Sequence, residues 1–250
     1  MRRIARKPAP DLVRQIEMFW SVTSRGGSGR SLYEVLPDSG VHLILRFSSC
    51  GCRMVLLGQA TEKACIEIDE SSDYFGIRFH PGHVPRLADI RPADLIDNHV
   101  DLPGIDGVSI DSLADRMLSS QDPALQQRVM EDLVRGTPPL IRDERCRQAI
   151  SLLKTHGGRL HVDELAAGIG LHVRSLERLF CDHLGMTPKR LARLVRLQHL
   201  ASRIRSGKAG NLTELAYACG YADQSHMIKD FKEMTGRLPG ENSTPVKLSN

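Results

Sequence analysis

A short sequence pattern occurs twice in the C-terminal half of the chain, at residues 165–185 and again at residues 215–236. Both copies begin with Leu-Ala, continue through a glycine and a phenylalanine, and end on a glycine. The Leu-Ala pair recurs after 50 residues, whereas the apolar anchors beyond the turn recur after 51, so the second turn is one residue longer. Each copy predicts a helix, a glycine turn and a second amphipathic helix, which is the pattern of a helix-turn-helix.

The charged residues are divided unevenly between the two halves of the chain. Residues 1–140 hold 16 Lys and Arg against 19 Asp and Glu, whereas residues 141–250 hold 18 against 11. The half with the repeat therefore carries a net charge of +7, and the other half carries −3. A local excess of positive charge favours a polyanionic partner such as DNA, because contacts with phosphates release counterions.

A chain of 250 residues is long enough for two domains, and the pattern changes near Gly136-Thr-Pro-Pro139. We therefore predict a β-rich domain with a helical end at 1–138 and an all-helical domain at 139–250, an α+β protein overall. No apolar run reaches the roughly 20 residues that span a bilayer. The N-terminus lacks the apolar core of a signal peptide, so we expect a cytoplasmic protein.

The N-terminal half contains short apolar runs separated by turn residues, which predict a small antiparallel sheet or barrel. The predicted strands are Leu32–Leu36, Val41–Phe47, Arg53–Leu57, Ala64–Ile68 and Tyr74–Phe79. Ser109–Leu118 and Pro123–Arg135 are predicted helices.

The C-terminal half is predicted to contain only helices. Their predicted ranges are Asp143–Lys154, Val162–Ile169, Val173–His183, Pro188–Arg205, Leu212–Cys219 and Asp223–Met234. The long helix at 188–205 connects the two copies, and its opening proline suits a helix N-terminus. Its basic residues are candidates for contacts with phosphate, namely Lys189, Arg190, Arg193, Arg196, Arg203 and Arg205.

The second helix of each copy carries polar side chains on the side opposite its apolar face. Arg forms two hydrogen bonds with guanine, Glu accepts from cytosine and Gln suits adenine, so these types can read bases in a major groove. The alternative is an ordinary solvated helix face. The candidate DNA-binding residues are Arg174, Ser175, Glu177 and Arg178 in the first copy, and Gln224, Ser225, His226 and Lys229 in the second.

Residues 160–236 resemble the AraC/XylS-type transcriptional regulators. The resemblance rests on Leu165-Ala166, Leu176-x-Arg178-x-Phe180, Gly185-x-x-Pro188, Arg196-Leu197 and Gly220-Tyr-Ala-Asp-Gln-Ser-His226, together with Phe231 and Gly236. It implies two helix-turn-helix units joined by a rigid helix, with base contacts from positions matching Arg174, Glu177, Arg178, Gln224, Ser225 and Lys229. Two features depart from the family pattern: His172 replaces the Ser or Thr that opens the first recognition helix, and Gly240-Glu241 replaces an aromatic-rich ending.

The N-terminal half is similar to the sensor domains of one subgroup of these regulators. The matching segments are Leu36-Pro37-Asp38, Gly76-x-x-Phe79-x-Pro81-Gly82 and Asp94-Leu95. Such domains are β-rich and often cupin-like, and the resemblance implies binding of a small-molecule effector, formation of a homodimer, or both. RNA polymerase is the further partner that the resemblance implies.

Metal and redox chemistry in the N-terminal half is the alternative reading. Cys50-Gly-Cys52 with Cys65 could bind a soft metal or sense oxidants, and His80 and His83 with His42 could bind a metal. We expect cysteines that pack between strands and a surface turn at His80-Pro-Gly-His83 instead, with no metal site. No nucleophile elbow, P-loop or dinucleotide motif occurs, so we predict neither an enzyme nor a cofactor.

The sequence therefore predicts a regulator that binds a specific promoter through two adjacent major grooves. One rival is a metal- or redox-responsive sensor whose N-terminal chemistry is primary. The other is a protein that organises DNA without sequence preference.

Overall fold

The computed structural model describes residues 2–24, 29–87, 89–105, 108–119, 122–206, 211–239 and 246–248. Gly240 and Glu241 lie outside these ranges. The chain forms two compact units. The first comprises residues 1–31, 40–58 and 68–142, and the second comprises residues 32–39, 59–67 and 143–250. The fold class is α+β, as the sequence predicts.

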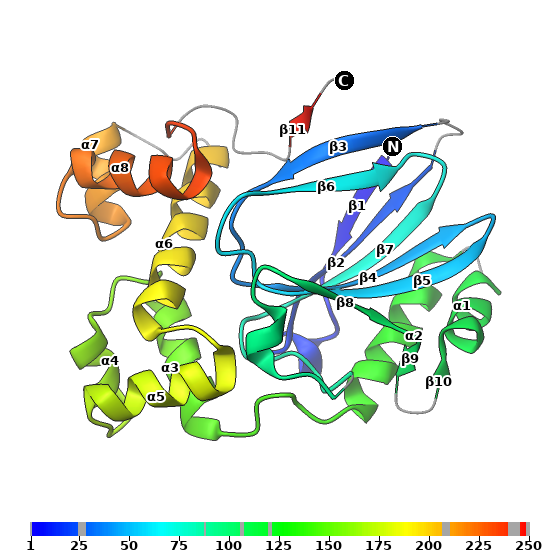
Figure 1. The fold of residues 1–250 in the computed structure, drawn as a ribbon, viewed down its shortest axis with the longest axis horizontal. Helices are drawn as coiled ribbons and strands as arrows, with labels where there is room; N and C mark the ends of the chain where they lie inside the picture. Colours follow the sequence, from blue (N-terminus) through cyan, green and yellow to red (C-terminus); the bar gives the residue numbers. More distant parts are fainter. Residues whose placement is uncertain are drawn as a thin grey trace. The chain divides into compact units, whose positions relative to one another are not determined.

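The first unit is built on a six-stranded antiparallel sheet (Figure 1). Its strand order is β1(Arg2–Arg6), β2(Ile16–Thr23), β7(Asp73–Phe79), β4(Val41–Ser48), β5(Gly51–Leu57) and β8(His99–Leu102). Alternate residues of β4 and β7 are buried, because successive side chains of a strand point to opposite faces. These positions are Val41, Leu43, Leu45, Phe75, Ile77 and Phe79.

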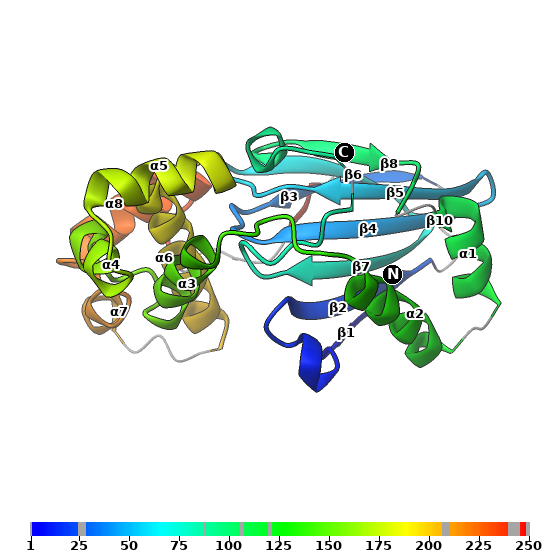
Figure 2. The same ribbon diagram turned by 90° about the horizontal axis from the view of Figure 1, so that it is seen from below.

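Two helices complete the core of this unit, α1(Ile110–Leu118) and α2(Pro123–Gly136). Figure 2 shows both helices beside the sheet. Leu113, Met117 and Met130 are buried in one cluster with the inward residues of the sheet. The helices begin at Ser109 and Asp122, whose side chains accept hydrogen bonds from the first turn.

Smaller elements complete the connections between these strands and helices. Two 3₁₀ turns, η1(Pro10–Leu12) and η2(Pro92–Leu95), and a short pair of strands, β9(Gly104–Ile105) and β10(Val108–Ser109), belong to the first unit. A three-stranded sheet of order β11(Val246–Leu248), β3(Arg30–Val35) and β6(Ala64–Asp69) is formed as well. The closed cupin-like barrel that the resemblance implies stays a prediction.

The second unit contains six helices among its described residues. They are α3(Glu144–Thr155), α4(Val162–Gly168), α5(Val173–Leu184), α6(Pro188–Arg205), α7(Leu212–Ala218) and α8(Gln224–Thr235). Each lies within two residues of its predicted bounds at both ends, and α6 matches them at both ends.

The helix pairs α4–α5 and α7–α8 repeat the same local geometry. Leu171 and Tyr221 each donate a backbone hydrogen bond of 2.9 Å, to the carbonyls of Ala166 and Ala216 respectively. Both recognition helices end at a left-handed glycine, Gly185 (φ 69°) or Gly236 (φ 71°), a conformation that costs glycine little. The extra residue in the second turn is Ala222, which lies between Tyr221 and Asp223, the residue that caps α8. The two turns therefore share the same backbone hydrogen bond and differ only after it.

The connecting helix α6 is buried around its whole circumference rather than on one face. Its buried positions are Pro188, Leu191, Ala192, Leu194, Val195, Leu197, Leu200 and Ala201. At 100° per residue these positions point in all directions around the axis. The helix is therefore a shared core element of the second unit, as predicted for a rigid connection.

Candidate nucleic-acid interface

The first recognition helix, α5, presents a polar face that begins one residue after its start. Leu176, Phe180 and Leu184 are buried at four-residue intervals and fix the inward side of the helix. Arg174, Glu177 and Arg178 are exposed, and Ser175 is half-buried. All four of the predicted first-copy residues thus lie near the N-terminal end of α5, where recognition helices contact base edges.

The N-terminus of α5 lacks a side-chain cap. His172 is the N-cap residue, and its side chain accepts no hydrogen bond from the first turn. The sequence indicated this loss, because His172 replaces a Ser or Thr. One orphan backbone donor therefore remains for water or for a phosphate oxygen.

The second recognition helix, α8, is capped and is oriented by the same kind of apolar side. Asp223 accepts a 2.7 Å hydrogen bond from the backbone nitrogen of His226, which confirms the predicted cap. Ser225, His226 and Lys229 are exposed, whereas Gln224 is half-buried and its Oε1 accepts from Thr213 Oγ1 at 3.1 Å. The second copy therefore presents its candidate residues at the corresponding end of its helix.

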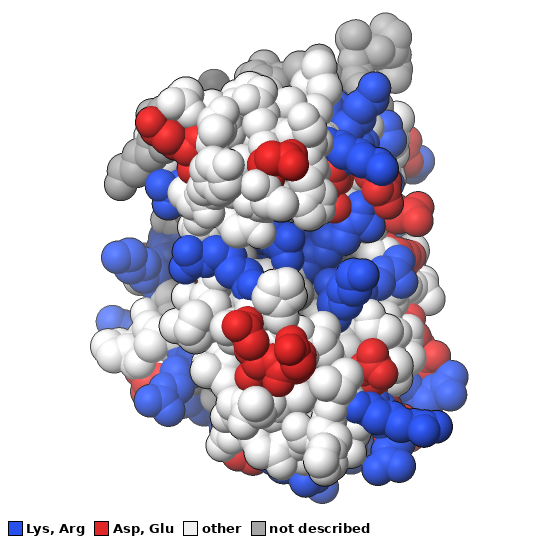
Figure 3. All heavy atoms as spheres, turned by 90° about the vertical axis from the view of Figure 1, so that its left-hand side faces the viewer, with Lys and Arg blue, Asp and Glu red and all other residues white. Residues whose placement is uncertain are grey.

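The charged candidates on both helices are not neutralised by neighbouring residues. Among the residues that the structure describes, Arg174, Arg178 and Lys229 form no ion pair, and Glu177 forms none either. Figure 3 shows the face that α4, α6, α7 and α8 present on the left of Figure 1, where Lys and Arg gather in a band between two lobes. Unpaired cations on an exposed face suit a polyanionic ligand.

Arg193 is one cation of α6 that is not available to phosphate. Its guanidinium group pairs with Asp230, and its Nη2 lies 2.9 Å from Glu233 Oε1, both on α8. The hydroxyl of buried Tyr221 donates to the other oxygen of Asp230 at 3.1 Å. Burial, and then the charge of Asp230, raise the pKa of Tyr221. Arg193 therefore orients the second recognition helix on α6, which corrects the phosphate-contact reading of this residue.

Alignment of the two copies of the repeat could have identified this hydrogen-bonded network from the sequence. With the 51-residue offset, Asp230 occupies the position of Leu179 in the first copy, and Tyr221 matches Leu171 in the common turn. An apolar pair in one copy is therefore a hydrogen-bonded polar pair in the other. Comparing the two copies position by position identifies Asp230 as a buried carboxylate that needs partners.

The structure does not bring the candidate metal ligands together. In the described part of the chain, no group of three His, Cys, Asp or Glu side chains has metal-binding geometry. His80 Nδ1 lies 3.4 Å from Glu17 Oε2, and His83 Nδ1 lies 3.0 Å from the carbonyl of Pro81, in the predicted turn. Cys52 packs against the core, and burial raises its pKa to about 11, which fits a strand-packing thiol rather than a reactive one. Cys50 and Cys65 are exposed, so the prediction that these cysteines pack between strands is wrong for both.

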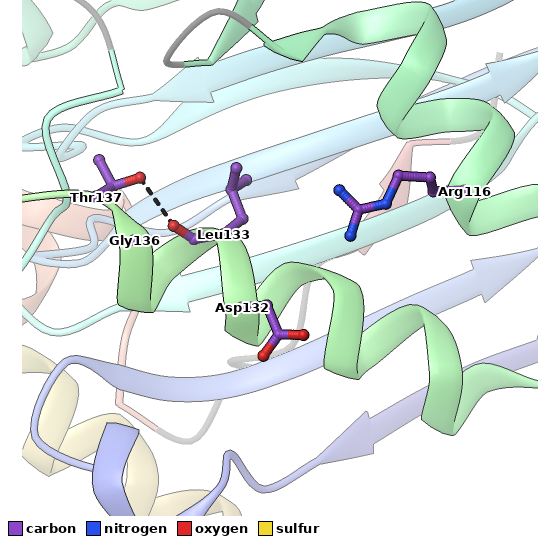
Figure 4. A pocket seen from close by; sticks show the side chains of 5 residues that line it. All are labelled: Arg116, Asp132, Leu133, Gly136 and Thr137. Atoms are coloured by element: carbon purple, nitrogen blue, oxygen red, sulfur yellow. Dashed lines mark hydrogen bonds between the residues drawn. The ribbon is translucent and has the colours of Figure 1, made fainter.

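A pocket of about 230 Å³ lies between α1 and α2 in the first unit (Figure 4). It is lined by Arg116, Asp132, Leu133, Gly136 and Thr137, and the Thr137 hydroxyl donates to the carbonyl of Leu133 at 2.8 Å. Binding sites for small molecules usually occupy about 300–1,000 Å³ and are mostly apolar. This pocket is smaller and has two charged side chains, Arg116 and Asp132, in its lining, so it gives no support for an effector site.

Comparison with known proteins gives matches to both halves of the chain. Residues 165–243 match a family model described as a helix-turn-helix domain, and residues 5–101 match one described as a domain of unknown function (DUF6597). An uncharacterized HTH-type transcriptional regulator of Haemophilus influenzae is 29% identical over 126 residues, which are 50% of this chain and 41% of that protein. The transcriptional activator RhaS of Pectobacterium carotovorum is 32% identical over 75 residues, which are 30% of this chain and 26% of that protein.

Solved structures match over different lengths of the chain. A probable AraC family transcriptional regulator from Rhodopseudomonas palustris is 26% identical, with a TM-score of 0.36, over 40% of this chain and 95% of that one. ToxT from Vibrio cholerae is 13% identical, with a TM-score of 0.49, over 89% of this chain and 96% of that one.

The chain spans less than half the length of the two curated relatives described above. The match to the helix-turn-helix model nevertheless covers both repeats, the connecting helix and all eight candidate residues. The chain therefore belongs to the AraC family of helix-turn-helix transcriptional regulators, with a domain of unknown function in its N-terminal half.

Proposed function

We propose that this protein binds a specific promoter sequence by placing α5 and α8 in two successive major grooves, and thereby changes transcription from that promoter. One observation carries the proposal. Two helix pairs with the same turn and the same C-terminal cap present polar side chains at the N-terminal ends of their second helices, and the charged ones form no ion pair within the described part of the chain. The AraC family is non-enzymatic, in agreement with this role.

The two reading heads have different chemistry, so we assign them different parts in recognition. Arg174 and Arg178 can each form two hydrogen bonds with a guanine, and Glu177 can accept from a cytosine. The second head carries Gln224, Ser225, His226 and Lys229, which is a less basic set. We assign sequence discrimination mainly to the first head, and register on the DNA mainly to the second.

The N-terminal domain supplies the regulatory input in this proposal, by binding a small-molecule effector, by forming a homodimer, or by both. RNA polymerase is the partner of the bound regulator. Several of the matched relatives are described as activators, which supports activation as the output.

No helix among the described residues is long and apolar enough to cross a bilayer. A cytoplasmic location is part of the proposal.

Selection of DNA from a random pool by the purified full-length chain tests this function. We expect enrichment of one sequence with two informative segments about 10 base pairs apart, and a nuclease footprint over both. Enrichment of no sequence, with equal affinity for random competitor DNA, would instead support a non-specific DNA-organising protein.

Arg178→Ala then tests the assignment of base reading. The variant should lose about 1–3 kcal/mol of binding free energy on the selected site and little on random DNA. Arg145→Ala is the matched control, because Arg145 is an exposed arginine of α3 that pairs with Asp143. Equal losses on selected and random DNA would make Arg178 a phosphate contact.

A further inference from the structure

Four basic side chains of the second unit gather without a carboxylate partner. Arg196, His199 and Arg203 are spaced by three and four residues on α6, which places them on one face of that helix. Arg159 joins them from the turn that follows α3. Among the described residues, none of the four forms an ion pair with Asp or Glu.

The turn that follows α3 and the turn between α7 and α8 both approach this cluster closely. The His199 ring lies against Gly157, with Nδ1 2.9 Å from the position that a Cβ of Gly157 would occupy. The Arg159 side chain crosses Gly220 in the α7–α8 turn, with Cγ 2.3 Å from the corresponding Cβ position. The cluster therefore lies where the turn after α3, the connecting helix and the second helix pair meet.

Two of the four donate a guanidinium nitrogen to a backbone carbonyl. Arg159 Nε donates to the carbonyl of His156 at 2.9 Å. Arg196 Nη2 donates to the carbonyl of Gly158 at 3.1 Å, and the guanidinium carbon lies 5.1 Å from the centre of the Tyr221 ring. His199 Nδ1 and Arg203 Nε are buried nitrogen atoms with no hydrogen-bond partner among the described residues. A buried polar atom without a partner is unfavourable, so a ligand that supplied hydrogen bonds to these side chains would stabilise the arrangement.

The electrostatics agree with the geometry. Burial, and then the charges of Arg203 and Arg159, lower the pKa of His199. Arg203, Arg159 and Arg196 all act on the thiol of Cys219, although burial is the larger effect and raises its pKa. The charges are therefore concentrated in one place and repel one another, and an anion would relieve that repulsion.

We propose that Arg159, His199 and Arg203 hold a phosphate of the DNA backbone at the stretch of strand that passes between the two reading heads. The inference rests on the proposed function, since it needs DNA bound by both heads. The cluster lies on α6, the helix that links the two heads, and beside the turn that precedes α8, so a strand that runs between the two bound grooves would pass close to it. A phosphodiester offers acceptor oxygens to the remaining guanidinium donors of Arg159 and Arg203 and to the His199 ring.

Salt dependence of binding provides the test. Arg203→Gln and Arg159→Gln should each reduce the slope of log K against log salt by about 0.9, the effect of losing one phosphate contact. His199→Gln should weaken binding more as the pH falls, because the wild-type imidazole gains a positive charge next to the phosphate. Arg145→Gln is the matched control, because Arg145 is an exposed arginine of α3 that pairs with Asp143. An unchanged slope in both arginine variants would overturn the proposal.

A second measurement needs no protein variant and is therefore independent of folding. Neutral methylphosphonates are placed one at a time along both strands of the selected site, and wild-type affinity is measured. We expect one or two sensitive positions between the grooves, at which Arg203→Gln causes no further loss. If neutral substitution between the grooves has no effect while the two-groove footprint persists, this inference fails and the proposed function stands. Absence of any selected site would instead remove the proposed function.

Inorganic phosphate is the alternative source of the same chemical group. Titration of the DNA-free protein with inorganic phosphate, followed by the His199 ring signals in an NMR spectrum, measures that binding directly. Saturable binding of inorganic phosphate, together with unchanged salt slopes for DNA, would replace the backbone assignment by a small-anion site.

Discussion

Single residues decide how each recognition helix begins, and the two copies differ there. Asp223 caps α8, whereas His172 opens α5 without a capping hydrogen bond. The first head therefore carries the more basic set of candidate base-contacting residues, and it carries them on the helix whose first turn is not capped. Fraying of the first turn would move Arg174 and Ser175 before it moved Arg178.

His172→Ser should restore the missing cap. We expect an increase of about 0.5–1 kcal/mol in the free energy of unfolding, because the serine hydroxyl accepts from a backbone nitrogen of the first turn. Urea denaturation measures this change. Asp223→Ala is the opposite control and should lose about 1 kcal/mol. A stability change of the same sign in both variants would contradict the capping argument.

His199 should make the stability of the protein depend on pH. The charged groups that act on it are Arg203 and Arg159, and both are positive. Its pKa is lowered in the folded state, so the unfolded chain binds its proton first as the pH falls. This contribution to stability is complete above the unfolded value near 6.5 and is lost progressively as the pH falls below that value.

Thermal unfolding of wild type and His199→Gln between pH 7.5 and 5.5, in the absence of DNA, measures the effect. The variant should lose less stability than wild type across this range. Equal pH profiles would show that His199 takes up its proton in the folded state at its ordinary pKa.

At the scale of elements, α6 sets the distance between the two heads. Its buried positions surround the axis, so both helix pairs share it as a core. Successive major grooves on one face of DNA lie about 34 Å apart, and both heads dock together only if the helix between them is stiff. The apolar residues of α6 thus contribute to DNA recognition without touching DNA.

Gln198→Pro tests this stiffness. A proline in the middle of a helix removes a backbone hydrogen bond and costs about 3 kcal/mol or more. We expect the footprint to shorten to one groove and specific affinity to fall. Gln198→Ala is the control, because it removes the side-chain hydrogen bonds of Gln198 and keeps the helix. If the proline variant folds and still protects both grooves at full affinity, the two heads are independent modules on a flexible tether.

Some elements were predictable from the sequence because local signals agree with their packing. Pro188 at the first turn and the regular apolar spacing located α6 at both ends. The strand β1 was missed, because Arg2–Arg6 reads as a basic start. It is an edge strand paired only with β2, and a sheet edge tolerates charge. The edge strand β8 was missed as well. His99–Leu102 alternates polar and apolar residues, but over only four positions in a stretch that reads as loop.

Part of the candidate site was likewise predictable from the sequence, and part of it was not. Helical spacing and the repeat predicted the outward residues of α5 and α8 directly. Asp230 and His199 went unnoticed, because a polar residue in a helix reads as surface until its neighbours in space are known. Their partners come from other elements, Arg193 on α6 for Asp230 and Arg159 in the turn after α3 for the His199 cluster.

At the scale of the whole molecule, we expect the DNA-binding half to be autonomous. A fragment of residues 139–250 should fold and bind the selected site as a monomer, with affinity that falls steeply as salt rises. Circular dichroism, analytical ultracentrifugation and a binding titration measure these three properties. The fragment lacks residues 32–39 and 59–67, which belong to the same compact unit. An unfolded fragment would show that the helical half needs those segments.

The hydrogen-bonded pair of Tyr221 and Asp230 has a consequence for how the duplicated half assembles. Two helix pairs with the same turn compete for the same two ends of α6 during folding. The buried carboxylate of Asp230 pairs with Arg193 of α6. If the two helix pairs docked on α6 in exchanged positions, Asp230 would be buried without this partner, and that arrangement is therefore disfavoured. Replacing Tyr221 and Asp230 together by the leucines of the first copy would remove that penalty. The resulting chain should form swapped or exchanged dimers even where its helices remain stable.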